Sequence, residues 1–212
     1  MTAIERTLFD SDHEIFRDTV RRFVEEEIAP FHAQWEKDGK ISRDAWLKAG
    51  ELGLRCASMP EEYGGGGVER TYSVILLEEL ARAGATGPGF GLHSEIVAPY
   101  INRYGSEEQK RKFLPKMAKG AMIGAIAMTE PGTGSDLQGV RTTALKDGNE
   151  LVINGSKTFI TNGEMSDVVI VVAKTDPDAG AKGISLVLVE AEREGFRKGR
   201  NLEKIGLKAQ DT

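Results

Sequence analysis

The chain has 212 residues, of which 40% are hydrophobic and 29% are charged, and its formal net charge is −5. This balance is typical of a soluble globular protein with a sizeable core, and the length allows one large domain or two small ones. An acidic chain is a poor candidate for sequence-independent nucleic-acid binding, which needs a basic surface, so we expect no nucleic-acid partner. We also expect no membrane span, because the most apolar run, residues 168–173, has only the length of a strand.

The cysteine and histidine content argues against disulfides and metal sites. Cys56 is the only cysteine, and we expect it to be a small buried hydrophobic side chain. His13, His32 and His93 are widely separated and none has a zinc-site spacing, so we expect no metal ion. The N-terminal segment resembles neither a secretory signal nor an Arg-rich transit peptide, which together with the single thiol favours a cytoplasmic protein.

Helical signals fill residues 1–120. Ser11 and Glu14 form a capping-box pattern at the start of the first helix, Pro30 is expected to kink or split that helix, and Gly39 to end it. The further helices that we expect lie at about 42–52, 72–83, 90–104 and 106–120, the last one capped by Ser106 with Gln109. The apolar stripe expected on the helix at 72–83 consists of Val74, Leu77, Leu80 and Ala81.

The pattern changes near Ala121 to short β-type runs separated by Asp-Gly and Asn-Gly turns. We therefore expect two domains, an all-α helical bundle at 1–120 and an antiparallel β-domain at 121–212. No closing element follows the last expected strands, so the second domain is expected to be truncated, with an unpaired sheet edge.

Several common catalytic patterns are missing from the sequence. There is no Gly-x-Ser-x-Gly for a serine hydrolase and no P-loop. Gly132, Gly134 and Gly139 suggest a dinucleotide-binding turn, but Leu137 occupies a position that needs glycine, and no βαβ unit follows. Read from its residues alone, the loop that ends in Asp136 is either an anion- or cofactor-binding loop or an ordinary β-turn.

Family resemblance changes that balance. Residues 127–136 resemble the first signature of the acyl-CoA dehydrogenase family, with Thr133 where a smaller residue is commoner. Residues 60–65 are similar to the loop that closes the early helices of that family, residues 154–163 to its second flavin-contacting segment, and residues 204–208 to its later Lys-x-Gly-x-Lys/Arg loop. The four matches occur in the same order as in the family and extend over nearly the whole chain. The sequence around them is most similar to that of the long-chain members.

The resemblance implies an α+β multidomain enzyme: an N-terminal α-bundle, a middle β-barrel that is incomplete here, and a C-terminal α-bundle that is absent. It implies FAD as cofactor, with contacts from the third domain and a partner subunit completing its site. The cofactor-binding residues that it implies are Ile126, Met128, Thr129, Gly134, Ser135, Phe159, Ile160 and Thr161. The substrate-binding residues that it implies are Ser135, Ala181 and Lys182.

The reaction implied by the resemblance is the α,β-dehydrogenation of a fatty acyl-CoA thioester, with hydride passing to flavin N5 and electrons to an electron-transferring flavoprotein. The family also implies a homotetramer. Its catalytic base is expected downstream of Thr212, so no catalytic residue is assigned, and Glu130 is interpreted as a structural loop residue. The alternatives are an acyl-CoA oxidase, a nitroalkane-oxidase-like flavoprotein, or a non-catalytic module that kept the fold.

Overall fold

The computed structural model of the chain describes residues 6–212, which form two compact units. Residues 6–122 and 203–210 make up a helical unit, and residues 123–202 and 211–212 make up a sheet unit. A helical N-terminal part followed by a sheet part was predicted from the sequence and is confirmed. Residues 203–210, which the sequence assigned to the second domain, pack with the helical unit instead: Ala209 is fully buried, and a Cβ at Gly87 would lie 2.7 Å from its methyl group.

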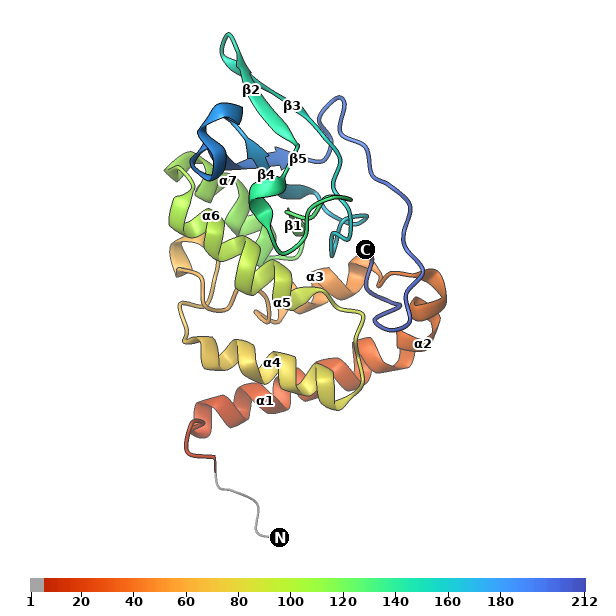
Figure 1. Ribbon diagram of the computed structural model, residues 1–212. Helices are drawn as coiled ribbons and strands as arrows, with labels where there is room; N and C mark the ends of the chain where they lie inside the picture. Colours follow the sequence, from red (N-terminus) through yellow and green to blue (C-terminus); the bar gives the residue numbers. More distant parts are fainter. Residues whose placement is uncertain (1–5) are drawn as a thin grey trace. The chain divides into compact units, whose positions relative to one another are not determined.

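The helical unit consists of helical segments, some of which follow one another without a gap, and the loops that connect the others (Figure 1). Its segments are α1 (Ser11–Phe23), η1 (Val24–Ile28), α2 (Ala29–Asp38), α3 (Arg43–Glu51), η2 (Glu61–Tyr63), α4 (Arg70–Arg82), α5 (Phe90–Leu92), η3 (His93–Val97), α6 (Ala98–Tyr104) and α7 (Glu107–Ala118). Among the described residues, no helix is both long and apolar enough to cross a membrane.

The helix ends follow the expected capping chemistry, with one correction. Asp10, not Ser11, caps α1: its carboxylate accepts the amides of Asp12 and His13, both at 3.1 Å, and the His13 ring accepts the Asp10 amide. The capping box of Ser106 and Gln109 at α7 is confirmed, with hydrogen bonds of 3.2 and 2.9 Å. The prediction at Ser11 missed by one residue because a carboxylate can accept two amides at once.

Two prolines stand directly after π-helical turns. Pro30 follows η1 and Pro99 follows η3, and in each case the preceding residue, Ala29 or Ala98, bonds to a carbonyl five residues earlier. Proline has no N–H and its ring clashes with the carbonyl four residues back, so a wider turn before it relieves both problems. The helix is not split at Pro30, because η1 runs directly into α2; the π-helical turn accommodates the proline instead.

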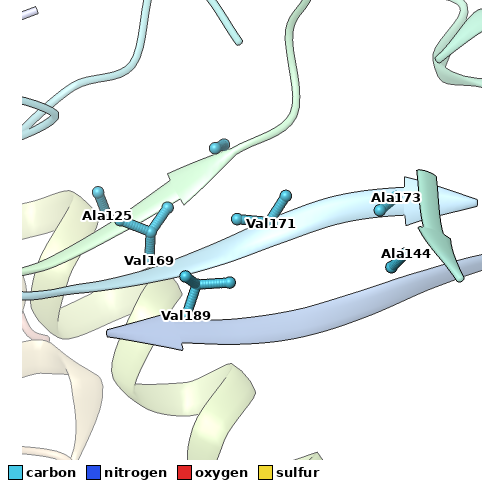
Figure 2. Close-up of a cluster of buried hydrophobic side chains, with 7 residues drawn as sticks. Ala125, Ala144, Val169, Val171, Ala173 and Val189 are labelled. Atoms are coloured by element: carbon cyan, nitrogen blue, oxygen red, sulfur yellow. The ribbon is translucent and has the colours of Figure 1, made fainter. Parts of the chain in front are cut away.

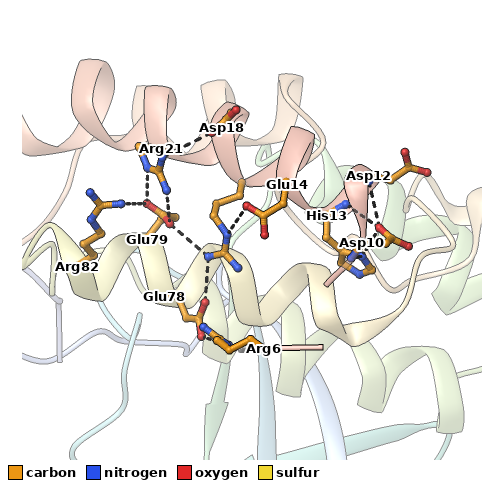
Figure 3. A network of polar contacts seen from close by, with 11 residues as sticks. Arg6, Asp10, Asp12, His13, Glu14, Asp18, Arg21, Glu78, Glu79 and Arg82 are labelled. Carbon is orange, nitrogen blue, oxygen red and sulfur yellow. Dashed lines mark hydrogen bonds and ion pairs between the residues drawn. The ribbon is translucent and has the colours of Figure 1, made fainter. Parts of the chain in front are cut away.

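An ionic network joins α1 to α4 (Figure 3). Its centre is Glu79, which is buried and pairs with Arg17 at 3.3 Å, Arg21 at 3.1 Å and Arg82 at 3.6 Å. The predicted apolar stripe on this helix is therefore largely wrong: Val74, Leu77 and Ala81 are exposed, Leu80 is buried, and the face that packs inward carries Glu79.

The sheet unit contains β1 (Gly124–Ala127), η4 (Leu137–Gly139), β2 (Thr143–Asp147), β3 (Glu150–Asn154), β4 (Val168–Lys174), η5 (Pro177–Gly183) and β5 (Ile184–Glu190). The pairs β2–β3 and β4–β5 are antiparallel, as predicted. The expectation of a purely antiparallel domain is wrong, because β2 pairs in parallel with β4 at Thr143 and Lys174, and β1 runs parallel to β4, with Gly124 opposite Val168. The connection between these two strands consists of the β2–β3 hairpin and loops, without an α-helix.

Small side chains fill one face of this sheet (Figure 2). Val169, Val171 and Ala173 of β4 alternate onto that face and meet Ala125 and Val189 from the flanking strands. The whole of β4 up to Ala173 is buried, which explains its unbroken apolar sequence: a strand covered on both faces has no polar side to alternate with.

Candidate functional site

The loop after β1 is a tight hairpin held by its own backbone. The amide and carbonyl of Glu130 exchange hydrogen bonds with those of Thr133 at 2.9 and 3.0 Å, with Pro131 and Gly132 at the turn. Asp136 then begins η4 by accepting the Gln138 amide at 3.0 Å. The segment 130–139 therefore has a defined shape, as a binding loop requires.

Glu130 anchors this hairpin to the rest of the sheet. One carboxylate oxygen accepts the Arg141 amide at 2.7 Å, and the other accepts the Thr142 amide at 3.0 Å and the Thr142 hydroxyl at 2.6 Å. These bonds, together with Lys157, hold the pKa of the Glu130 carboxyl down at about 2, against the opposing effect of burial. A carboxylate this acidic and this fully hydrogen-bonded is a poor proton acceptor, in agreement with its interpretation as a structural residue.

Lys157 joins the same hairpin to a second segment. Its ammonium group donates to the Met128 carbonyl at 3.0 Å and to the Glu130 carboxylate at 2.8 Å. One residue later, the Thr158 amide donates to the Thr129 carbonyl at 2.9 Å. Two stretches almost thirty residues apart in the sequence are thereby fixed side by side at the carboxyl end of β1.

The second segment carries unusual backbone conformations. Phe159 has a φ of 57° and Asn162 a φ of 63°. Both values lie in the left-handed region, which residues other than glycine rarely adopt. The Phe159 ring is 66% exposed, whereas the Asn162 side chain is buried and donates to the Gly124 carbonyl at 3.2 Å. A left-handed backbone at a residue other than glycine costs energy, and such conformations cluster at functional sites.

The structure brings most of the predicted cofactor residues to this one region. Ile126 is buried in β1, Met128 is partly exposed just beyond it, and Thr129 is half-buried. Ile160 and Thr161 are half-buried and follow Phe159 on the second segment. All of these residues are within a few positions of the bonds between Met128–Thr129 and Lys157–Thr158.

The remaining predicted residues are exposed. Gly134 and Ser135 follow the hairpin, and apart from the two chain neighbours of Gly134 no atom of the described residues lies within 4 Å of a Cβ built on it. Ala181 and Lys182 lie on η5, which leaves the same end of the sheet because β1 and β4 run parallel, but the bonds around Lys157 do not include them. Within residues 6–212, no group of three or more His, Cys, Asp or Glu side chains could hold a metal ion.

Lys157 is the site residue that sequence reasoning passed over. It lies inside the segment that carries the family resemblance, but its two acceptors are 27 and 29 residues away, and no local pattern points to them. The available signal was a lysine inside a predicted contact segment, three residues after the end of a strand.

Comparison with known proteins decides the family. Residues 10–121 match the family model described as acyl-CoA dehydrogenase, N-terminal domain, and residues 125–212 match the model described as acyl-CoA dehydrogenase, middle domain. The chain belongs to the acyl-CoA dehydrogenase family. Among its relatives is the long-chain specific acyl-CoA dehydrogenase, mitochondrial, of Sus scrofa, which is 59% identical over 98% of this chain and 49% of the relative.

Solved acyl-CoA dehydrogenase structures share the fold. That of acyl-CoA dehydrogenase from Geobacillus kaustophilus is 50% identical, with a TM-score of 0.94 over 98% of this chain and 55% of its own. An acyl-CoA dehydrogenase from Bacillus anthracis, complexed with FAD, is 35% identical, with a TM-score of 0.87 over 98% of this chain and 35% of its own. The chain spans about half the length of the curated relatives it matches.

Proposed function

We propose that this chain supplies the N-terminal and middle parts of a flavin-dependent enzyme that removes hydrogen from the α and β carbons of long-chain fatty acyl-CoA thioesters. The observation that carries the proposal is the joining of Met128–Thr129 to Lys157–Thr158 in a chain of this family. The similarity to a long-chain specific relative supports the long-chain preference.

The residues present fit an FAD cofactor. The strained, exposed Phe159 offers an aromatic face, Thr129 and Thr161 offer hydroxyl groups, and Gly134 leaves room for close approach of an anion to the backbone. Ile126, Met128 and Ile160 would complete the contacts to the ring, and Ser135 would meet the phosphates. A structure of similar fold contains FAD, which supports the same cofactor here.

When bound, FAD would supply the hydride acceptor, its N5 atom. The chain's own part is to hold the ring and to offer hydrogen-bond donors and a cation to the substrate: Ser135, Ala181 and Lys182 would contact acyl-CoA. The electrons would pass to an electron-transferring flavoprotein, and the assembled enzyme would be a cytoplasmic homotetramer.

No carboxylate of this chain is assigned as the base that removes the α-proton. Glu130 is unsuitable because its hydrogen bonds keep its pKa at about 2. We propose that the base lies outside these residues and that the chain by itself is inactive.

FAD binding tests the proposal. Replacing Thr129 or Thr161 by valine removes the hydroxyl group and leaves a side chain of nearly the same volume. The loss of one hydrogen bond of about 0.5–1.5 kcal/mol should weaken FAD affinity roughly 2- to 10-fold. The control is Thr19→Val in α1, whose hydroxyl donates only to the Ile15 carbonyl of its own helix. Fluorescence quenching of FAD reports the affinity; equal affinities for all four proteins would refute the placement of the ring.

A further inference from the structure

Lys157 has an unusual environment for a lysine in a loop. Its side chain is only 10% exposed, and its ammonium group has both a backbone and a carboxylate acceptor. Taking a lysine out of water is costly unless such partners are in place, so this geometry specifies where the Lys157 side chain must lie.

The Glu130 partner is itself fixed. Its carboxylate is held by the Arg141 and Thr142 amides and by the Thr142 hydroxyl, so it cannot move to follow a displaced lysine. The Glu130–Lys157 pair is therefore a rigid connection between the start of β2, the hairpin after β1 and the segment that begins at Lys157.

The bond to the Met128 carbonyl has an electrostatic consequence. A cation on a carbonyl oxygen polarises the whole peptide group, because hydrogen bonds in series strengthen one another. The peptide concerned joins Met128 to Thr129, so the Thr129 N–H becomes a stronger donor. The Thr129 carbonyl, in turn, accepts the Thr158 amide at 2.9 Å and fixes the spacing of the two segments.

We propose that Lys157, held by Glu130, is a positioning residue for the flavin: it sets the spacing between Met128–Thr129 and Phe159–Thr161 and tunes the charge that the bound ring experiences. This inference rests on the proposed function, in which those two segments contact FAD. It adds two residues, Lys157 and Glu130, that act on the cofactor through others.

A purely structural ion pair would affect folding alone, so the test separates placement from stability. In Lys157→Met, hydrogen exchange of the Thr158 amide should accelerate about tenfold or more, because the segment loses its anchor while the β4 amides keep theirs. The control is Lys146→Met on β2, which removes an exposed lysine from the same sheet unit. Acceleration of Thr158 only in step with β4 would overturn the positioning role.

The sign of the charge provides a second readout, which does not depend on activity. With FAD bound, Lys157→Met leaves the Glu130 carboxylate unpaired and should lower the midpoint potential of the flavin. Glu130→Gln leaves the ammonium unpaired and should raise it, and the double variant should return close to the unaltered chain. A structural defect would shift both single variants in the same direction, and that result would overturn the proposal.

The role of Lys157 and the proposed function can be refuted separately. If the unaltered chain takes up FAD but the midpoint potentials of the two single variants do not shift in opposite directions, only the role of Lys157 is refuted. If the unaltered chain takes up no FAD at saturating concentration, the proposed function fails, and the role of Lys157 fails with it.

Discussion

Arg55 is a residue whose environment opposes its charge. It is 1% exposed, its guanidinium stacks at 4.0 Å from the Trp46 ring and 4.8 Å from the Phe90 ring, and within the described residues its three side-chain nitrogens have no hydrogen-bond partner. Burial lowers the pKa of Arg55 to about 9 and, together with the Arg55 charge, lowers the pKa of the buried His93 well below its usual value.

Replacing Arg55 by methionine should stabilise the chain. Methionine fills a similar space without unsatisfied donors, and we expect a gain of about 1–3 kcal/mol at pH 7 in the free energy of unfolding, measured by denaturant titration. Arg22→Met on the exposed face of α1 is the control and should change stability by less than about 0.5 kcal/mol.

The pH dependence of that gain has a definite sign. The unfolded Arg55 keeps its proton well above pH 9, whereas the folded one, whose pKa is lowered by burial to about 9, loses it there. The unfolded state then binds more protons, so the unaltered chain gains stability from this group as the pH rises from 9. The advantage of the methionine variant should shrink as the pH rises above about 9; an advantage that stays constant or grows would show that Arg55 is not the cause.

At the residue scale, the sequence predicts which residues belong to the candidate site better than it predicts their burial and their hydrogen-bond partners. The motif that contains Thr129 and Glu130 was recognised, and Cys56 is buried as expected. The partners of Glu130 could not be predicted, because they arrive from positions 11 to 27 residues away through the fold. Arg55 was not predicted to be buried, because arginine is rarely found in a protein core.

At the scale of elements, the ionic network between α1 and α4 should contribute more to the free energy of unfolding than its exposed ion pairs do. Replacing the buried Glu79 by alanine leaves Arg17 and Arg21 without their shared acceptor, and we expect a loss of about 1–3 kcal/mol in the free energy of unfolding. Asp18→Ala breaks only an exposed pair with Arg21, at 3.6 Å, and should cost less than about 0.5 kcal/mol.

Thermal or denaturant unfolding compares these two variants directly. Equal losses would mean that the network acts as a set of surface pairs and that α1 is held by apolar packing alone. A loss confined to Glu79→Ala, with faster amide exchange in α1, is the expected outcome.

The ends of helices were predictable because local capping residues set them. The buried face of α4 was less predictable because tertiary contacts set it. Ser106, Gln109 and Gly39 mark helix ends as expected, since caps are local chemistry. The burial of Glu79 and the exposure of Leu77 depend on arginines that arrive from α1, more than fifty residues earlier, so the apolar stripe alone misplaced the inward face.

At the scale of the whole molecule, the order of helices before strands follows from the change in sequence period near residue 121. The parallel pairing of β1 with β4 does not, because nothing in either strand records which other strand it meets. The same holds for residues 203–210, which leave the sheet unit and pack in the helical one.

The central proposal is that this chain holds the flavin side of an acyl-CoA dehydrogenase and that the base lies outside these residues. Acidity at the α-carbon of a thioester is too weak for proton loss without a positioned base, which typically contributes about 10²- to 10⁴-fold. The alternatives on the same fold share this requirement, so the claim concerns chemistry rather than substrate.

The most direct measurement is anaerobic bleaching of the flavin. The chain is reconstituted with FAD and mixed with a long-chain acyl-CoA, and the loss of flavin absorbance is followed against free FAD. We predict that FAD binds and that the bound flavin bleaches no faster than free FAD. Rapid bleaching by the chain would contradict the account and would show that a base lies within these residues.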